Sequence, residues 1–173
     1  MKYFVVVSTL NTPTSPTMTF QLNRQIPSGS KISLYQFNYD ITSDAQTSAP
    51  AYDVVIDKAS WANTSTGILV CLDNLINTKS FSFSTDSSGI ASTTTLPILD
   101  VIPVELFISS SSSNTRKRLG SYAPKVNVPL EISSPISAID MSLRNARNGE
   151  LHTASQLEKY VFTFTLLIED VAR

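Results

Sequence analysis

The strongest structural signal in this chain is a strictly alternating run near its C-terminal end, Tyr160–Glu169. Large apolar side chains occupy every second position of this run, and mostly Thr and Val lie between them. Successive side chains of a β-strand point to opposite faces, so the run predicts a strand with one apolar face and one mixed face. The residues expected in the core are Tyr160, Phe162, Phe164, Leu166 and Ile168.

A similar but less strict alternation predicts a strand over Pro135–Leu143. The connection from Arg144 to Lys159 contains the turn-forming pair Asn148-Gly149 and exceeds the two to five residues of common hairpin loops. The two strands are therefore expected to form an antiparallel hairpin. Their long connection is a prominent loop and a candidate contact surface.

Further strand-like segments follow one another along the chain, each bounded by Ser, Asn, Asp, Gly or Pro. A helical period of ten or more residues is missing from the sequence, although Thr153–Lys159 has room for one helical turn. This pattern predicts an all-β domain, a sandwich or jelly roll of about eight antiparallel strands. The segments are Tyr3–Leu10, Thr17–Leu22, Lys31–Ile41, Tyr52–Ile56, Gly67–Leu72, Lys79–Thr85, Leu96–Ile108 and Tyr122–Ile132.

Two of these segments have expected places in a sheet. Lys31–Ile41 carries large side chains on both faces and is expected to be a central strand. Tyr3–Leu10 is expected at an edge, where its backbone would need a covering partner.

The length of 173 residues favours one domain, covering residues 1–173. A domain of this size buries about 70% of its unfolded surface and needs no metal or disulfide for support. The single cysteine, Cys71, lies in an apolar run, so no intrachain disulfide forms and the side chain is expected to be a small buried residue of a strand.

Composition excludes several functional classes. Only 16% of the residues are charged and the formal net charge is -1, which gives no field to attract nucleic acid. No run reaches the roughly 20 apolar residues of a membrane-spanning helix. The apolar run Tyr3–Val7 is too short for a secretory signal, and none is expected. Ser and Thr make up about a quarter of the chain; such weakly charged β-rich surfaces are typical of adhesins, fibre proteins and capsid subunits.

The residues offer little for catalysis. The single histidine, His152, follows the Asn148-Gly149 turn and is expected at the surface, and no nucleophile stands at a characteristic spacing from it. The sequence lacks a phosphate-binding glycine loop, and its carboxylates are scattered singly. The protein is expected not to be an enzyme, with no cofactor and no metal.

A serine run, Ser109–Ser113, leads into the basic residues Arg116, Lys117 and Arg118. This composition predicts a loop. Its three charges are explained by a solvated loop tip, or by a contact with phosphate or with an acidic patch on a neighbouring subunit.

Several segments, in order, resemble the single jelly-roll capsid proteins, penton-type or minor, of large eukaryotic DNA viruses, virophages and polinton-like elements. The C-terminal forty or so residues carry the resemblance best, because an Ile-rich strand, an Asn-Gly turn and an aromatic-rich last strand follow one another. The first 60 or so residues match only in being β-rich. The matching segments are Gly67–Leu75, Leu96–Pro103, Ser134–Leu143, Asn148-Gly149 and Tyr160–Ile168.

The resemblance implies a structural protein of the virion, assembled inside the host cell. A penton subunit would form a homopentameric ring at the icosahedral vertices and would contact neighbouring major and minor capsid proteins. The alternative role is a minor or cement protein between larger capsomers. Two loops, Ser109–Arg118 and Arg144–Lys159, are the candidates for contacts between subunits. The candidate residues are Ser109, Ser113, Arg116, Lys117, Arg118, Asn148, Gly149 and His152.

A second alternative is a module that binds carbohydrate or a receptor, such as a fibre head or an adhesin domain. Sugars stack on exposed aromatic rings, and Trp61 lies in a polar segment, with Tyr52 or Tyr122 as companions. Trp61 could equally cap one end of the sandwich core, because large aromatic residues are highly buried on average.

Overall fold

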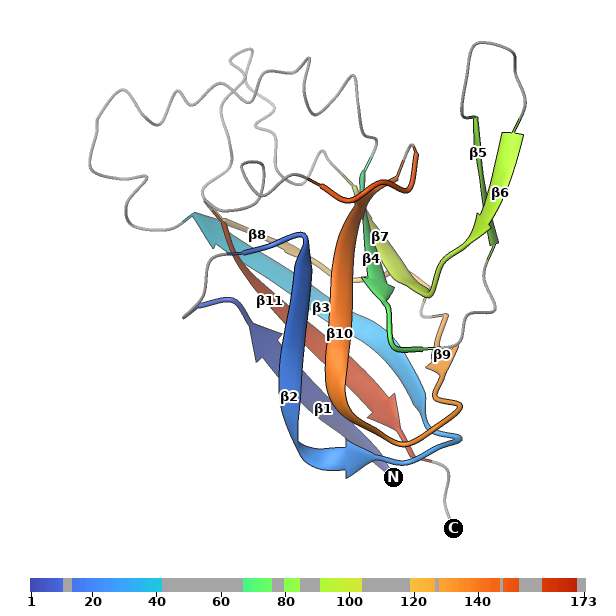
Figure 1. Cartoon of the computed structure of the whole chain (residues 1–173). Coiled ribbons are helices and arrows are strands. Elements are labelled where there is room, and N and C mark those ends of the chain that lie inside the picture. The colour runs from blue at the N-terminus through green and yellow to red at the C-terminus, as the bar shows by residue number, and fades with distance from the viewer. Residues whose placement is uncertain are drawn as a thin grey trace.

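The structure, a computed structural model, describes residues 1–10, 14–41, 67–75, 80–84, 91–103, 119–126, 128–146, 148–152 and 160–170. Within these ranges the regular elements are all β-strands (Figure 1). In chain order they are β1 (Lys2–Ser8), β2 (Thr17–Ile26), β3 (Lys31–Ile41), β4 (Gly67–Leu72), β5 (Ser80–Ser84), β6 (Ala91–Thr95), β7 (Ile98–Pro103), β8 (Leu119–Tyr122), β9 (Leu130–Glu131), β10 (Ile136–Asn145) and β11 (Tyr160–Glu169).

Two antiparallel sheets face each other in Figure 1. One has the strand order β1-β11-β3-β8, with the short β9 also paired to β3, and we call it the first sheet. The second sheet has the order β2-β10-β4-β7. The ribbon β5-β6 pairs only within itself among the described strands and extends away from the sandwich in Figure 1.

The order of these strands is that of a jelly roll. The chain passes from one sheet to the other at β1 to β2, β2 to β3, β3 to β4, β7 to β8, β9 to β10 and β10 to β11. Each sheet thus interleaves strands from both ends of the chain, as two Greek keys do. The predicted all-β jelly roll is confirmed: among the described strands, nine form the two sheets, the short β9 included, and β5 and β6 form the separate ribbon.

The predicted apolar face of β11 is the centre of the core. Buried and partly exposed residues alternate strictly along the strand, and the five predicted core residues are all at most 1% exposed. Phe37 of β3 packs against Phe162 and Phe164, with both pairs of ring centres 5.1 Å apart. β3 pairs with β11 on one side and with β8 and β9 on the other, which confirms it as a central strand.

All six residues of β4 are buried. One face of the strand joins the main core, and the other packs with Ile98 in a smaller cluster that contains Leu69 and Cys71. Cys71 is 0% exposed, so the expectation of a small buried residue within a strand is confirmed.

The predicted hairpin between the last two long strands is wrong. β10 pairs with β2 and β4, whereas β11 pairs with β1 and β3 in the other sheet. A loop of two to five residues would hold the strands side by side, but this connection is long enough for the chain to cross the sandwich. Both strands were predicted correctly, and only their pairing differs.

The predicted strand Tyr122–Ile132 is also wrong as a single strand. β8 ends at Tyr122 and β9 begins at Leu130, and the two pair with different parts of β3. Pro124 and Pro129 lie between them. Proline has no backbone N–H to contribute to a ladder, which interrupts the pairing along β3.

The remaining strand predictions fall into three groups. β1, β2, β5 and β7 confirm predicted strands with shifted ends. β6 was not predicted, because its sequence ASTTT has no apolar alternation. Two predictions lie outside the described residues, the strand Tyr52–Ile56 and the helical turn at Thr153–Lys159.

Candidate interaction site

The described residues offer no metal centre, since no three of their His, Cys, Asp or Glu side chains gather in one place. Within the same ranges no helix is long and apolar enough to cross a membrane.

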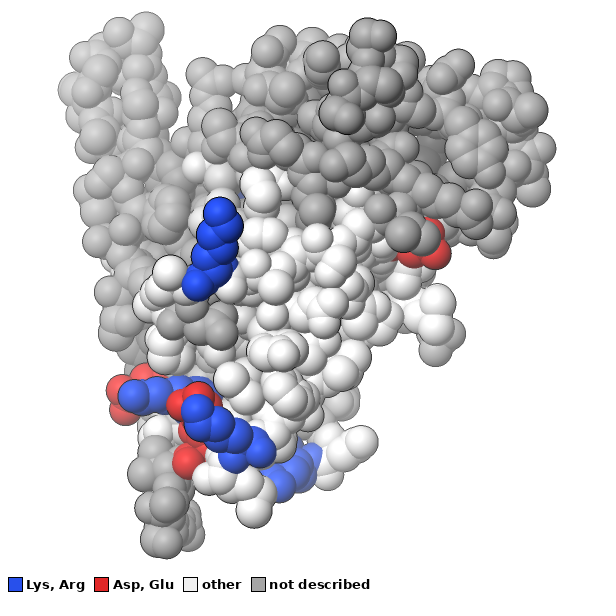
Figure 2. Space-filling model, turned by 180° about the vertical axis from the view of Figure 1, so that it is seen from behind, with Lys and Arg blue, Asp and Glu red and all other residues white. Residues whose placement is uncertain are grey.

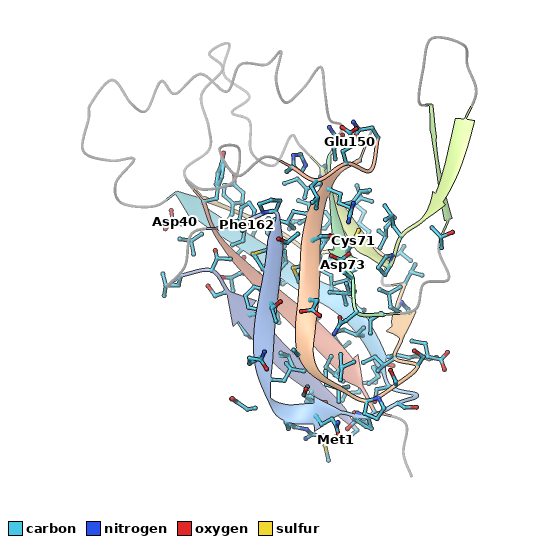
Figure 3. The ribbon with its side chains drawn as sticks, viewed as in Figure 1. Met1, Asp40, Cys71, Asp73, Glu150 and Phe162 are labelled. Carbon is cyan, nitrogen blue, oxygen red and sulfur yellow. The ribbon has the colours of Figure 1, made fainter. Side chains whose placement is uncertain are left out.

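The Asn148-Gly149 turn forms as predicted at the end of β10. Gly149 has a φ of 75°, the left-handed conformation that favours glycine, and its N–H donates to the Asn145 carbonyl at 2.8 Å. Asn148 Nδ2 donates to Glu150 Oε2 at 2.7 Å, and Figure 3 shows Glu150 at the tip of this turn. The turn is compact and held by its own hydrogen bonds.

His152 lies behind this turn and is only 5% exposed, so the expectation of a surface histidine is wrong. The backbone N–H of His152 donates to the Leu143 carbonyl at 3.0 Å, so the chain after the turn runs back alongside β10. Of the three candidate contact residues in this loop, Asn148 is exposed, while Gly149 and His152 are buried. The other candidates, Ser109, Ser113, Arg116, Lys117, Arg118 and Trp61, lie outside the described residues.

Charged residues on the outer face of the first sheet form one row across it. The register places Lys2, Glu169, Lys31 and Glu131 side by side on β1, β11, β3 and β9, so that positive and negative side chains alternate. Lys2 Nζ lies 2.6 Å from Glu169 Oε1. This hydrogen bond, with the charges of Lys2 and Lys31, lowers the pKa of Glu169 below its ordinary value of 4.5.

Beyond this row the middle of the face has no charge. Exposed Phe4 and Val6 of β1 lie beside Leu167 and Thr165 of β11. The next row is uncharged and polar: Ser8, Thr163, Asn38 and Ser121. Figure 2 shows this face from outside: charged side chains gather at its lower end, further basic and acidic side chains lie toward its left and right margins, and a white area lies between them.

Two aromatic rings meet in this uncharged area, although a strand separates their backbones. The centres of the Phe4 and Tyr35 rings are 4.7 Å apart, and the side chains are 55% and 47% exposed. A bulge in the pairing of β3 with β11 leaves Tyr35 between two paired residues and allows its ring to reach over β11. The rings form an apolar ridge in contact with solvent.

β1 is the edge strand of this sheet, as predicted for Tyr3–Leu10, and its hydrogen-bonding pattern shows which groups face the open side. Thr9 N–H donates to the Phe162 carbonyl at 2.9 Å, and Asp170 N–H donates to the Met1 carbonyl at 2.7 Å. Odd-numbered residues of β1 therefore direct their backbone groups toward β11. The N–H and C=O groups of Phe4 and Val6 point outward, along an edge without proline or bulge.

A cleft of about 280 Å³ runs along this open edge, between β1 of the first sheet and β2, the edge strand of the second. Arg24 is one of its lining residues, and its guanidinium lies 4.4 Å from the centre of the Tyr3 ring and 3.2 Å from Asp170 Oδ2. Most of the remaining lining is aliphatic. The aliphatic lining residues include Val5 of β1 and Leu22 of β2.

The opposite edge of the same sheet also exposes apolar side chains. Between β8 and β9, Val126 is 75% exposed and Val128 is 52% exposed. Both strands pair with β3 on the side away from β11, so this segment and β1 lie at opposite edges.

Sequence reasoning placed the candidate contacts in loops and missed these sheet surfaces. A signal was present in β1, where five consecutive residues, Tyr3–Val7, are apolar. Such a run puts apolar side chains on both faces of a strand, so an edge position in a two-sheet sandwich leaves one apolar face exposed.

No protein-family model matches this chain, and no curated protein matches its sequence. Solved structures do match. One is the selenomethionine-labelled mavirus penton protein. It superimposes with a TM-score of 0.58 at 8% sequence identity, over 99% of this chain and 100% of that one. At this identity the likeness shows a shared fold, and the fold extends over both chains from end to end.

Proposed function

We propose that this protein is a structural capsid protein whose subunits form a homopentameric penton at the icosahedral vertices. The observation that carries the proposal is the match over 99% of the chain to the mavirus penton protein.

The surface of the first sheet supports a role in assembly. Its uncharged area combines the exposed ridge of Phe4 and Tyr35 with neutral polar rows. Depletion of charge and enrichment of aromatic side chains are typical of the centre of a protein interface. A subunit packed between two neighbours would remove such a surface from water.

A closed ring requires a heterologous contact, in which each subunit uses two different surfaces. The two apolar edges of the first sheet are candidates for these surfaces. The segments Ser109–Arg118 and Arg144–Lys159, which the sequence predicts to be loops, remain the proposed contacts with neighbouring capsid proteins, because loops commonly carry interactions. A minor or cement role would use the same loops without the ring.

The molar mass of the untagged protein, measured by light scattering over a range of concentrations, tests the proposal. We expect pentamers, or a shift toward pentamers as the concentration rises, and electron micrographs of single particles should show five-fold rings. A monomer at every concentration would contradict the penton role. In that case binding to purified major capsid protein would test the cement role.

A further inference from the structure

We infer that adjacent subunits of the ring meet edge to edge across the first sheet. The open edge of β1 and the β1–β2 cleft of one copy receive the exposed Val126 and Val128 of the next copy. We call the first surface the acceptor and the second the donor. This inference rests on the proposed ring, and it names the two surfaces that close it.

The acceptor combines backbone groups with an apolar cleft. Phe4 and Val6 direct their N–H and C=O groups outward, so an added chain can pair with β1 by main-chain hydrogen bonds. Behind this edge, Val5 and Leu22 line the cleft. Edge strands in monomeric proteins are usually protected by charge, proline or a bulge, and only Lys2 at the end of β1 carries a charge.

The size of the cleft suits side chains of a partner. About 280 Å³ lies at the lower limit of the roughly 300–1,000 Å³ of small-molecule sites, and it has room for a few side chains. Its aliphatic lining suits aliphatic side chains, because burying apolar surface is the favourable term. The exposed valines of the donor have this chemistry.

The position of the donor matches the geometry of a closed ring. Val126 and Val128 lie between β8 and β9, at the edge of the sheet opposite β1. Each subunit therefore carries a donor and an acceptor on opposite flanks, so that contacts run head to tail.

An isologous contact, β1 against β1 of a second copy, would cover the same edge. In the matching register Val5 would face itself across a two-fold axis, and Phe4 would face Val6. Such a contact joins two copies only and cannot build a ring of five. It also leaves Val126 and Val128 outside the contact. Substitutions at these two residues therefore distinguish the two arrangements.

The acceptor is blocked by Val6→Pro. Proline removes the outward N–H of an even-numbered residue and leaves the hydrogen bonds between β1 and β11 in place, since those come from the odd-numbered residues. Val6→Ala, which retains the N–H, is the matched control. If Val6→Pro does not fold, Val6→Lys places a charge at the same exposed edge position.

The donor is blocked by the double variant Val126→Asp with Val128→Asp. Its matched control, Ser133→Asp with Ser134→Asp, adds the same two charges at exposed positions between β9 and β10. Circular dichroism and thermal unfolding establish that every variant is folded before its molar mass is measured.

We expect wild type and both controls to be pentameric, and each blocked variant to be monomeric. A 1:1 mixture of the two blocked variants should give heterodimers and nothing larger, because one intact donor meets one intact acceptor. The mixture is measured well above the concentration at which wild-type pentamers form, since a single contact lacks the support of a closed ring.

Pentamers of either folded blocked variant would overturn the inference while the proposed function stands. The same holds if the mixture remains monomeric. Wild-type dimers that Val6→Pro abolishes and the donor variant retains would indicate the isologous contact instead, and the proposed ring would fail with the inference. Failure of the proposed function is recognised separately, because wild type itself would then form no pentamer.

Discussion

The ring of Tyr39 lies directly over Gly120, its partner across β3 and β8. A Cβ atom on Gly120 would come within 2.7 Å of Tyr39 Cζ and 2.8 Å of its hydroxyl oxygen. Tyr39 is only 3% exposed and packs edge-on against the Tyr160 ring, with ring centres 5.6 Å apart. The tyrosine therefore occupies the space that any other residue at position 120 would need.

Gly120→Ala should destabilise the fold by about 1–3 kcal/mol, the usual cost of overpacking a core. Urea unfolding measures the change, and Ser121→Ala, at the exposed neighbouring position, should lie within about 0.5 kcal/mol of wild type. Adding Tyr39→Leu should remove most of the penalty of the alanine, because the clash is with the ring. Equal unfolding midpoints for Gly120→Ala and wild type would contradict this packing.

Thr9 and Thr14 form a buried polar link at the end of β1. Their hydroxyl oxygens are 2.8 Å apart, and Phe162 N–H donates to Thr9 Oγ1 at 2.9 Å. Thr9→Val keeps the shape of the side chain but leaves the buried N–H of Phe162 without this acceptor. We expect a loss of about 1–3 kcal/mol in the free energy of unfolding.

Thr163→Val makes the same exchange on the outer face of β11, where the hydroxyl meets Ser8 Oγ at 3.1 Å on an exposed surface. It serves as the matched control for Thr9→Val and should change stability by about 0.5 kcal/mol or less. If both variants unfold at the same urea concentration, the link between Thr9 and Phe162 does not stabilise the end of β1.

Cys71 should be inert in the folded protein. Burial raises the pKa of its thiol from 9.0 to about 12, with Asp73 adding to the rise and Arg144 opposing it. About one thiol in ten thousand is then ionised at pH 8, and the thiolate is the reactive form. A thiol reagent should label native protein only as fast as the protein opens, and should label it at once in denaturant. Rapid labelling of the native state would show that β4 is accessible, against its full burial.

The pKa of Glu169 should respond to Lys2. Because the lysine lowers this pKa, its contribution to stability is present above pH 4.5 and is lost as the pH falls through the value in the folded state. Lys2→Met should raise the pKa of Glu169 toward 4.5, as measured by NMR titration of its carboxyl carbon. Lys31→Met should raise it less, because Lys31 acts through its charge alone. An unchanged titration in Lys2→Met would show that the salt bridge is not formed in solution.

The positions of the long strands were predictable because side-chain alternation is a local property. β11 and most of β10 follow directly from it, and the large residues on both faces of β3 identified a central strand. Alternation does not identify the neighbouring strand. The predicted hairpin of β10 with β11 is wrong for this reason, because each strand belongs to a different sheet.

The candidate site was harder to predict because it depends on which face of each sheet is covered. Phe4 and Tyr35 are far apart in sequence and come together only because β1 and β3 both flank β11 and a bulge turns Tyr35 outward. His152 was expected at the surface from its polar surroundings in sequence, but its backbone returns along β10 and buries it.

The pairing of β1 with β11 has a consequence for how the protein is made. β1 has no other partner among the described strands, and about 150 residues separate the two strands. At translation rates of ~5–20 residues per second, roughly 8 to 30 s pass between the synthesis of the apolar strand β1 and that of β11. The first sheet can therefore close only late in synthesis, and until then the apolar run Tyr3–Val7 of the nascent chain lacks the strand that pairs with it.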